Sequence, residues 1–340
     1  MPEQNDLLSM AFDQYQRYTA VTQVADLIRA SLAVPHLRVL DVGGFFCTRS
    51  GTKFLPLVRF LPDDDVTVAD LAEESMAQYV VADGRSLPFA SQAFDLVVSC
   101  DTLEHVPPAG RTAFIDELLR ATGRCLVLIA PFDGESNRLA ERILAEYIRA
   151  QGLGHRLLQE HIDLGLPDSS AVRELLSDRG MDFFDFGDGY LHHWLLMMLI
   201  KHTPGYPPGF YEDLDRYYNR HFSAHDRREP AYRRVFVAVR PSDRAWLPAM
   251  ADRLVPARPS TVSLGPDLLE EFVRGLNLNR IAALNTAVSS AERQASALQS
   301  RVAAQASENE ALRQTIASFE RGRFIRLMRT VALWRRKMGL

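Results

Sequence analysis

The sequence predicts an α/β protein in which a doubly wound, mostly parallel, seven-stranded sheet is followed by a long C-terminal coiled-coil helix. Short apolar segments alternate with segments of helical spacing across residues 1–240. Aspartates stand at the ends of several apolar segments, and a seven-residue apolar repeat occupies the C-terminal part. Apolar strands that alternate with helices are typical of a parallel sheet covered on both faces.

The composition is that of a globular protein with an uneven charge distribution. Its 340 residues, 47% hydrophobic and 24% charged, suffice for one α/β domain and an extension. The net charge is −4, yet residues 320–340 carry seven basic side chains against Glu320 alone, so this tail holds +6 and the remainder −10. An acidic body with a basic tail indicates that the tail has a partner of its own.

Cysteine usage and the absence of targeting signals predict a cytoplasmic protein. Cys47, Cys100 and Cys125 lie far apart without a CxxC pattern, which favours a reducing compartment. The N-terminus has no basic region followed by an apolar core, and the longest apolar run, 194–200, is too short to span a bilayer. Any membrane contact is therefore expected to be peripheral, at the inner face.

The predicted elements follow one another in the order that a doubly wound sheet requires. A leading helical region precedes a strand that ends in the glycine turn Asp41-Val-Gly-Gly44. Apolar, β-branched segments predict the remaining strands over 66–69, 79–82, 94–99, 124–130, 181–186 and 233–240. Helical spacing predicts helices over 7–32, 54–60, 111–121, 136–151, 169–179 and 190–201.

Four aspartates occupy equivalent positions in this pattern, at the carboxyl ends of predicted strands. They are Asp41, Asp70, Asp83 and Asp101. Aspartate favours turns in general, which accounts for any one of them. Ligands of open α/β sheets bind outside the carboxyl ends of the strands, so four aspartates in a row favour a binding edge.

Several of these segments together resemble the class I S-adenosylmethionine-dependent methyltransferases, in the subgroup called type 11. The resemblance covers about residues 10–135 and rests on the spacing of Val39-Leu-Asp-Val-Gly-Gly44, Asp70, Asp83-Gly-Arg-Ser-Leu-Pro-Phe89, Phe94-Asp-Leu-Val-Val-Ser99 and Leu103-Glu-His-Val106. It implies a Rossmann-like methyltransferase fold with an antiparallel seventh strand. It also implies S-adenosylmethionine as the cofactor.

The resemblance assigns cofactor roles to residues along the strand ends. Asp41, Gly43 and Gly44 would line the methionine end of the cofactor. Asp70, followed by Leu71, would hold the two ribose hydroxyls. The remaining implied positions are Asp83 at the adenine amino group, Gly84 making space for the ring, and Asp101 and Leu103 edging the site of methyl transfer.

The glycine turn departs from the family pattern at Phe45. The family's Asp-x-Gly-x-Gly places a glycine where this chain has Phe45, followed by Phe46. A bulky residue there is expected to narrow the pocket or reshape the turn. Cofactor binding is still the favoured interpretation, and a non-catalytic scaffold with a degenerate methyltransferase domain is the competing one.

His105 is the predicted catalytic residue because it follows the fourth strand and its imidazole titrates near neutral pH. A structural histidine at this position is the alternative. Further histidines and a glutamate lie downstream, at His155, Glu160, His161, His192 and His193. We interpret His192 and His193 as a helix start, and no spacing here is specific enough to predict a metal site.

The chain divides into four predicted regions. Residues 1–240 form the methyltransferase domain, with 132–232 facing the acceptor, and 241–266 form a proline-rich linker. Residues 267–319 form a coiled coil, because apolar residues recur at alternating spacings of three and four. The seam, in which only Gln305 and Asn309 are polar, is Ile281, Leu284, Val288, Ala291, Ala295, Leu298, Val302, Gln305, Asn309, Leu312, Ile316 and Phe319. A homo-oligomer or a partner coil is expected, with a helix folded back on the body as the alternative.

Residues 320–340 predict a basic amphipathic helix. Apolar residues including Leu327, Val331 and Trp334 follow helical spacing among arginines, a composition that suits an anionic membrane surface. RNA, an acidic protein or a solvated helix would also satisfy it, although no nucleic-acid motif is present and none is expected as a partner. The layout also resembles, by architecture alone, methyltransferases of bacterial cell-surface polysaccharide pathways.

The sequence therefore predicts methyl transfer from S-adenosylmethionine to a small-molecule or glycan acceptor. The favoured acceptor is a sugar hydroxyl of a cell-surface glycan precursor at the cytoplasmic membrane face. Methylation of a small lipid or natural product is the alternative within enzymes.

Overall fold

The computed structural model describes residues 6–48, 51–206, 209–258, 260–262 and 266–339. Side chains of 266–285, 320, 323 and 324 lie outside this description, so the predicted seam residues Ile281 and Leu284 do as well. The chain separates into two compact units, Met1–Gly275 and Leu276–Leu340, which are described in turn.

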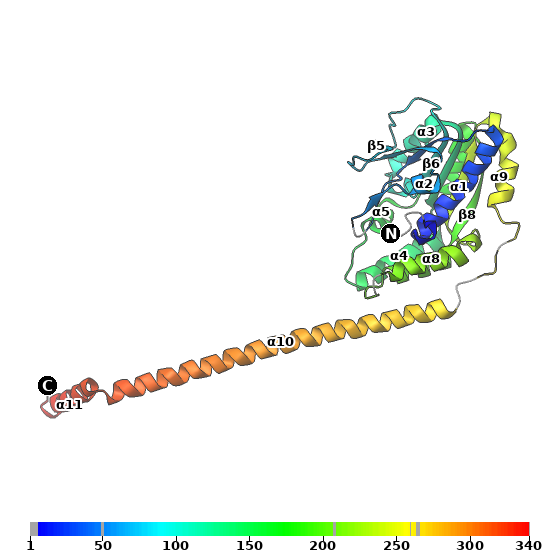
Figure 1. The fold of residues 1–340 in the computed structure, drawn as a ribbon. Coiled ribbons are helices and arrows are strands. Elements are labelled where there is room, and N and C mark those ends of the chain that lie inside the picture. Colours follow the sequence, from blue (N-terminus) through cyan, green and yellow to red (C-terminus); the bar gives the residue numbers. More distant parts are fainter. Residues whose placement is uncertain (1–5, 49–50, 207–208, 259, 263–265, 340) are drawn as a thin grey trace. The chain divides into compact units, whose positions relative to one another are not determined.

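The first unit is built on the predicted seven-stranded sheet, whose strand order is β5-β4-β1-β6-β7-β9-β8 (Figure 1). The five strands β5, β4, β1, β6 and β7 are parallel, whereas β9 is antiparallel to both of its neighbours. The strands are β1 Arg38–Val42, β4 Asp65–Asp70, β5 Tyr79–Val81, β6 Phe94–Cys100, β7 Thr122–Pro131, β8 Asp182–Tyr190 and β9 Ala231–Val239. The predicted fold class and the antiparallel last strand are confirmed.

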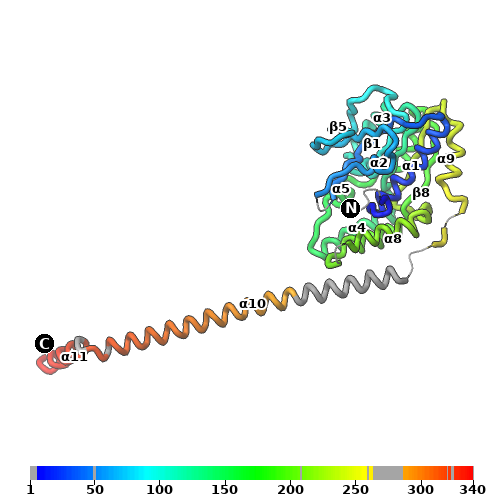
Figure 2. The backbone as a smooth tube through the Cα atoms, viewed as in Figure 1, coloured from blue at the N-terminus to red at the C-terminus, as the bar shows by residue number. Residues whose placement is uncertain are grey.

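Helices cover both faces of the sheet because its central strands bury side chains on both sides. On one face, α1 (Phe12–Leu32), α2 (Pro56–Phe60) and α9 (Leu247–Leu254) enclose one core cluster. On the other face, α3 (Arg111–Ala121) and α6 (Ser169–Asp178) enclose the second. The paths of α1 and α9 run side by side (Figures 1 and 2). Two packed faces are what a doubly wound sheet requires.

A third apolar cluster joins the helices of the region predicted to face the acceptor. It contains residues of α4 (Glu135–Ala150), α5 (Arg156–Leu164), α7 (Leu191–Lys201) and α8 (Phe210–His221), together with Phe12. The tyrosines predicted as a pocket lining contribute partly to this core, since Tyr218 is fully buried while Tyr217 is 51% exposed. The short hairpin β2 (Phe46–Cys47) and β3 (Lys53–Phe54), like α5 and α8, was not predicted.

The predicted proline-rich linker, residues 241–266, is corrected by the structure. The short helix η5 (Pro241–Trp246) and α9 occupy most of it, and Met250 and Leu254 are buried in the core. Two of the prolines, Pro241 and Pro248, stand in the first turn of these helices, where a missing N–H costs nothing because the first turn leaves its N–H groups unpaired. Prolines that begin helices were thus mistaken for a linker signal.

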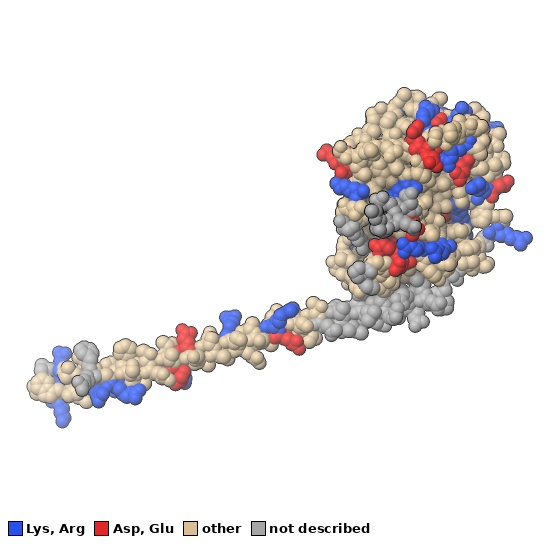
Figure 3. Space-filling model, in the orientation of Figure 1, with Lys and Arg blue, Asp and Glu red and all other residues tan. Residues whose placement is uncertain are grey.

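The second unit consists of α10 (Pro266–Arg321) from Leu276 onward and of α11 (Arg323–Lys337), separated at Gly322. Described seam residues of α10 are exposed in the single chain, with Val302 at 64% and Ile316 at 59%. Basic side chains are visible on α11, whereas the described part of α10 shows both acidic and basic side chains between stretches of uncharged surface (Figure 3). Within the described residues, no helix has the length and apolar character needed to cross a membrane.

Candidate functional site

The glycine turn after β1 is held between two neighbouring strands. Gly43 has φ +85° and its N–H donates to the Ala69 carbonyl at 2.8 Å, while the Ser99 hydroxyl donates to the Val42 carbonyl at 3.0 Å. A Cβ on Gly43 would lie 2.1 Å from Thr102 Oγ1, and one on Gly44 would lie 2.1 Å from Asp41 Oδ2. Both glycines are therefore required by the close approach of neighbouring side chains, and Gly43 is half-buried at this edge of the sheet.

Replacing Gly43 with alanine is expected to lower the free energy of unfolding by more than about 2 kcal/mol, because positive-φ strain adds to a steric clash. Gly51 is a matched control, since it has φ +84° and a Cβ added there would meet nothing within 4 Å. Gly51→Ala should lower the free energy of unfolding through the backbone strain alone, by about 1 kcal/mol. Chemical denaturation of both variants measures the difference, and equal losses would contradict a tight turn at Gly43.

Asp41 lies directly beneath this turn and is completely buried. Its Oδ2 accepts a hydrogen bond from the Tyr18 hydroxyl at 3.2 Å, and within the described residues Oδ1 has no hydrogen-bond partner. Burial raises the pKa of Asp41 to about 7, although the Tyr18 hydrogen bond opposes the change. A buried carboxylate oxygen that accepts no hydrogen bond from the protein can accept one from a polar group of a ligand.

Asp70 ends β4 beside the turn, and its two oxygens accept different backbone donors. Phe45 N–H donates to Oδ2 at 3.2 Å and Ala72 N–H to Oδ1 at 3.3 Å. Each carboxylate oxygen has a second lone pair, so the pair can still accept two hydroxyls. Next to it, Leu71 is 69% exposed, an apolar surface that a flat ring can cover.

Phe45, the departure from the glycine pattern, is accommodated beside this aspartate. Its ring packs edge-on against Tyr79 with centroids 5.7 Å apart. Phe46 instead contacts Phe54 across the short hairpin, at 5.2 Å. The bulky pair is thus directed into packing contacts, while the Phe45 N–H serves Asp70.

Asp83 and Gly84 follow β5 and have local partners of their own. Arg85 binds both Asp83 oxygens, with Nη2 2.6 Å from Oδ2, and its hydrogen bonds lower the pKa of Asp83. A Cβ on Gly84 would lie 2.4 Å from the Phe114 ring. Glycine is therefore needed here for packing against α3, and the adenine roles of this pair stay predictions.

Asp101 follows β6 in a left-handed conformation, φ +49°, and is the centre of a buried ion-pair network. Arg233 Nε and Nη2 bind its carboxylate at 2.8 and 2.6 Å, and Arg17 of α1 binds the same group. Burial would raise the pKa of Asp101, but the two guanidinium groups outweigh burial and lower it. The side chain is thus committed to protein partners.

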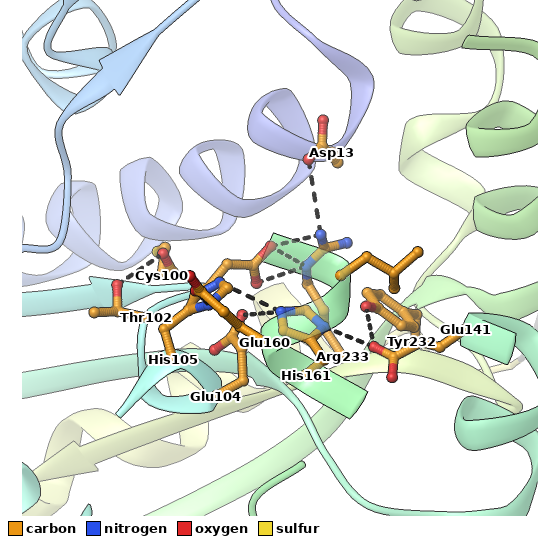
Figure 4. A network of polar contacts seen from close by, with 12 residues as sticks. Asp13, Cys100, Thr102, Glu104, His105, Glu141, Glu160, His161, Tyr232 and Arg233 are labelled. Atoms are coloured by element: carbon orange, nitrogen blue, oxygen red, sulfur yellow. Dashed lines mark hydrogen bonds and ion pairs between the residues drawn. The ribbon is translucent and has the colours of Figure 1, made fainter. Parts of the chain in front are cut away.

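The segment after Asp101 carries both an apolar anchor and a polar cluster (Figure 4). Leu103 is fully buried in the core facing α3, so its side chain anchors the segment. His105 Nδ1 lies 2.9 Å from Glu160 Oε2, and its Nε2 lies 3.3 Å from His161 Nε2 of α5. Burial and His161 lower the pKa of His105, although Glu160 opposes them, which favours the neutral imidazole.

Sequence reasoning missed the residues that arrive here from distant elements. Arg17 comes from α1, Arg233 and Tyr232 from β9, and Glu141 from α4. A signal was available for Arg233, because it and Arg234 interrupt an otherwise apolar strand, where a buried charge needs a partner. The other downstream histidines have partners elsewhere. His155 caps α5, buried His193 binds Asp226, and exposed His192 contacts Tyr190.

The comparison with known proteins finds similarity to methyltransferases. Residues 54–127 match the family model described as a methyltransferase domain. A protein of Mycobacterium sp. (strain JLS), described as an uncharacterized methyltransferase, is 33% identical over 150 residues, which cover 41% of this chain and 57% of that protein. The chain thus matches somewhat more than half the length of this relative.

Solved structures with a similar fold include two at low sequence identity. The magnesium protoporphyrin IX methyltransferase of Synechocystis PCC 6803, solved with bound SAH, is 16% identical with a TM-score of 0.36, covering 66% of this chain and 85% of that one. The YcgJ protein from Bacillus is 13% identical with a TM-score of 0.37, covering 64% and 97%.

Proposed function

We propose that this chain is an S-adenosylmethionine-dependent methyltransferase whose cofactor lies across the carboxyl ends of β5, β4 and β1. The observation that carries the proposal is the joining of Asp70 to the glycine turn through the Phe45 N–H. That contact brings a carboxylate that can bind a diol and the half-buried backbone of Gly43 to one edge, in a chain whose residues 54–127 match a methyltransferase domain.

The residues present fit the cofactor's functional groups. The unpartnered Asp41 Oδ1 suits the ammonium group, and the Gly43-Gly44 cradle has no room for side chains of its own. Asp70 suits the ribose hydroxyls by bidentate acceptance, and the exposed Leu71 offers an apolar surface for the adenine. Cationic, hydroxyl and apolar parts of the ligand thus meet matching groups.

Methyl transfer needs in-line alignment and removal of the acceptor's proton. S-Adenosylmethionine supplies an electrophilic methyl group bound to a sulfonium sulfur. Bound at this edge, the cofactor would give up that methyl group to the acceptor oxygen, and the electron pair of the carbon–sulfur bond would remain on sulfur. The acceptor's proton must leave toward the protein. His105 stands after β6 with a ring held by Glu160, and we assign it to the acceptor side of the reaction.

Cofactor affinity is expected to rise as the pH rises through about 7, the raised pKa of Asp41. The folded protein keeps a proton on Asp41 below that pH, and this proton must leave before the carboxylate can pair with an ammonium group. Tyr18→Phe removes the hydroxyl that favours the carboxylate, so it should shift the affinity profile to higher pH. Calorimetry across the pH range checks both, and a profile unaltered by Tyr18→Phe would contradict the role of Asp41.

We further propose that the acceptor is a sugar hydroxyl of a cell-surface glycan precursor, with a small lipid or natural product as the alternative. Support comes from the basic, aromatic helix α11, which suits a reaction at an anionic surface. Incubation with S-adenosylmethionine and a panel of glycan and lipid acceptors, read by product mass, tests the choice. A methylated lipid without a methylated glycan would favour the alternative.

A non-catalytic scaffold is the competing function, motivated by Phe45 in the glycine turn. The packing of Phe45 on Tyr79 argues for an intact turn. Calorimetry with the cofactor separates the two classes, because a scaffold with a degenerate domain has no need to bind it.

A second copy of the chain is the proposed partner of α10. The described apolar seam residues are exposed in a single chain, including Leu298 at 58% and Leu312 at 54%, and their seven-residue repeat is continuous. Sedimentation equilibrium of the full chain should give an oligomer. Leu298→Asp should return it to a monomer, and a monomeric parent protein would contradict the coil.

An anionic membrane surface is the proposed partner of α11. Trp334 and Leu327 are 60% and 59% exposed, and three basic residues stand in the last turn. Each cation contributes about 1 kcal/mol near anionic headgroups. Flotation with anionic and neutral vesicles tests this, comparing the full chain with a form ending at residue 319. Equal flotation of both forms would remove the proposal.

A further inference from the structure

Three potential metal ligands converge beside the candidate acceptor site, although they come from separate parts of the chain. Glu104 and His105 belong to the short helix η2 (Leu103–His105) directly after β6, and His161 belongs to α5. One ligand atom from each lies within 4.8 Å of the other two. Figure 4 shows these side chains directed toward one another.

The two imidazole nitrogens already stand at a metal-binding separation. His105 Nε2 and His161 Nε2 are 3.3 Å apart, and Glu104 Oε1 lies 3.9 Å from His161 Nε2. Two nitrogens bound at 2.0–2.1 Å around a tetrahedral ion lie about 3.3 Å apart. The histidine pair therefore needs little movement, and Glu104 needs a small rotation toward the pair.

The outer nitrogens of both rings are fixed by carboxylates. His105 Nδ1 lies 2.9 Å from Glu160, and His161 Nδ1 lies 2.8 Å from Glu141 Oε1, which also accepts the Tyr232 hydroxyl. These carboxylates place the ring protons on Nδ1, so both Nε2 atoms carry lone pairs that face each other. Carboxylate–histidine pairs of this kind orient metal-binding imidazoles.

Glu104 provides a second observation that points to a cation. Its side chain is 1% exposed, and within the described residues Oε2 has no hydrogen-bond partner. The neighbouring arginines, Arg17 and Arg233, are already engaged by Asp101. A buried carboxylate without a counterion is costly, and a bound cation would remove that cost.

We propose that Glu104, His105 and His161 bind one divalent first-row transition-metal ion. Two imidazoles and one carboxylate suit zinc, manganese, iron or cobalt, whereas magnesium and calcium prefer oxygen ligands. Three protein ligands leave coordination positions open for an outside ligand. Because η2 follows β6 next to Thr102, which contacts the glycine turn, the ligand that fits is an acceptor oxygen. This last step rests on the proposed function.

The role that follows is activation of the acceptor's hydroxyl group. An oxygen bound to a divalent ion loses its proton more readily. His105 would then act as a ligand that holds the ion, and Glu141 and Glu160 as positioning residues. The site does not require the cofactor, so it can be tested by itself.

Cobalt(II) titration of the metal-stripped full chain tests the site, because ligand-field absorption reports nitrogen coordination. The expected result is saturation at one ion per chain, with zinc displacing cobalt. Glu104→Gln and His161→Ala should each weaken binding by more than about 100-fold, and the outer Glu141→Gln by 10–100-fold. Exposed His192 is a matched control outside the cluster, and His192→Ala should leave cobalt binding unchanged.

The outcomes separate the metal site from methyl transfer. Absence of a cobalt spectrum, or one unaltered by Glu104→Gln, would overturn the site, and the histidine pair would then share a proton. Cofactor calorimetry on the same metal-stripped protein gives the second readout. Cofactor binding without cobalt binding defeats only the metal proposal. Cobalt binding without cofactor binding defeats only the proposed function.

Discussion

Replacing Asp70 with alanine is expected to weaken S-adenosylmethionine binding by 100-fold or more. Two hydroxyl groups that donate to a carboxylate are each worth about 1.5–3 kcal/mol. The same substitution removes the acceptor of the Phe45 and Ala72 N–H groups, so the glycine turn also loses a support. The loss of affinity should therefore exceed that of any other single strand-end aspartate.

Isothermal calorimetry measures this effect, with a control from the same strand. Asp65 begins β4 at the opposite edge of the sheet and is exposed. Asp65→Ala should keep the parent affinity. Asp70→Asn keeps the side-chain shape but lacks the charge. Its affinity for the cofactor should lie between those of Asp65→Ala and Asp70→Ala. Parent-like affinity in Asp70→Ala would refute the assignment of this edge as the cofactor site.

Replacing Asp101 with asparagine is expected to cost about 3–5 kcal/mol of folding free energy, the usual loss when one partner of a buried ion pair is removed. Asp101 is the shared counterion of Arg17 and Arg233, whose side chains are only 9% and 3% exposed. Asparagine fills the same volume but leaves both cations with only their longer contacts to Asp13, at 3.4 and 3.8 Å. Denaturant unfolding of the full chain measures the loss.

The loss should also depend on pH in a defined direction. The folded-state pKa of Asp101 is lowered from 3.8, so its stabilisation is present above 3.8 and disappears as the pH falls toward the folded-state value. Parent protein and Asp101→Asn should therefore converge in acid. Arg179→Gln is the control, since the Arg179–Asp116 pair is exposed at both side chains and should contribute below about 1 kcal/mol. A similar loss in both variants would contradict a special role for the buried network.

Most of the sheet could be predicted from the sequence because its central strands are apolar runs. β6 was predicted within one residue and α3 at its observed bounds. The prediction failed where local composition and tertiary packing disagree. α9 has a proline in its first turn yet buries Met250, and α8 carries aromatic residues that resemble a loop in sequence.

The strand-end aspartates of the site could be predicted, because parallel strands bring their carboxyl ends to one edge. Their partners could not. Arg17 and Arg233 lie 84 and 132 positions from Asp101, and His161 lies 56 positions from His105. Such pairs form because of how the helices pack over the sheet. The spacing of residues along one sequence does not reveal that packing. Asp83 differs from these residues because its partner is local: Arg85 lies only two positions away in the sequence.

Titration of S-adenosylmethionine into the full chain by isothermal calorimetry tests the central claim most directly. The account predicts saturable binding at one site per chain, with affinity that rises through the pKa of Asp41 and is lost in Asp70→Ala. Absence of binding heat at millimolar cofactor, across temperatures that exclude a vanishing enthalpy, would contradict the claim and leave the domain as a scaffold for α10.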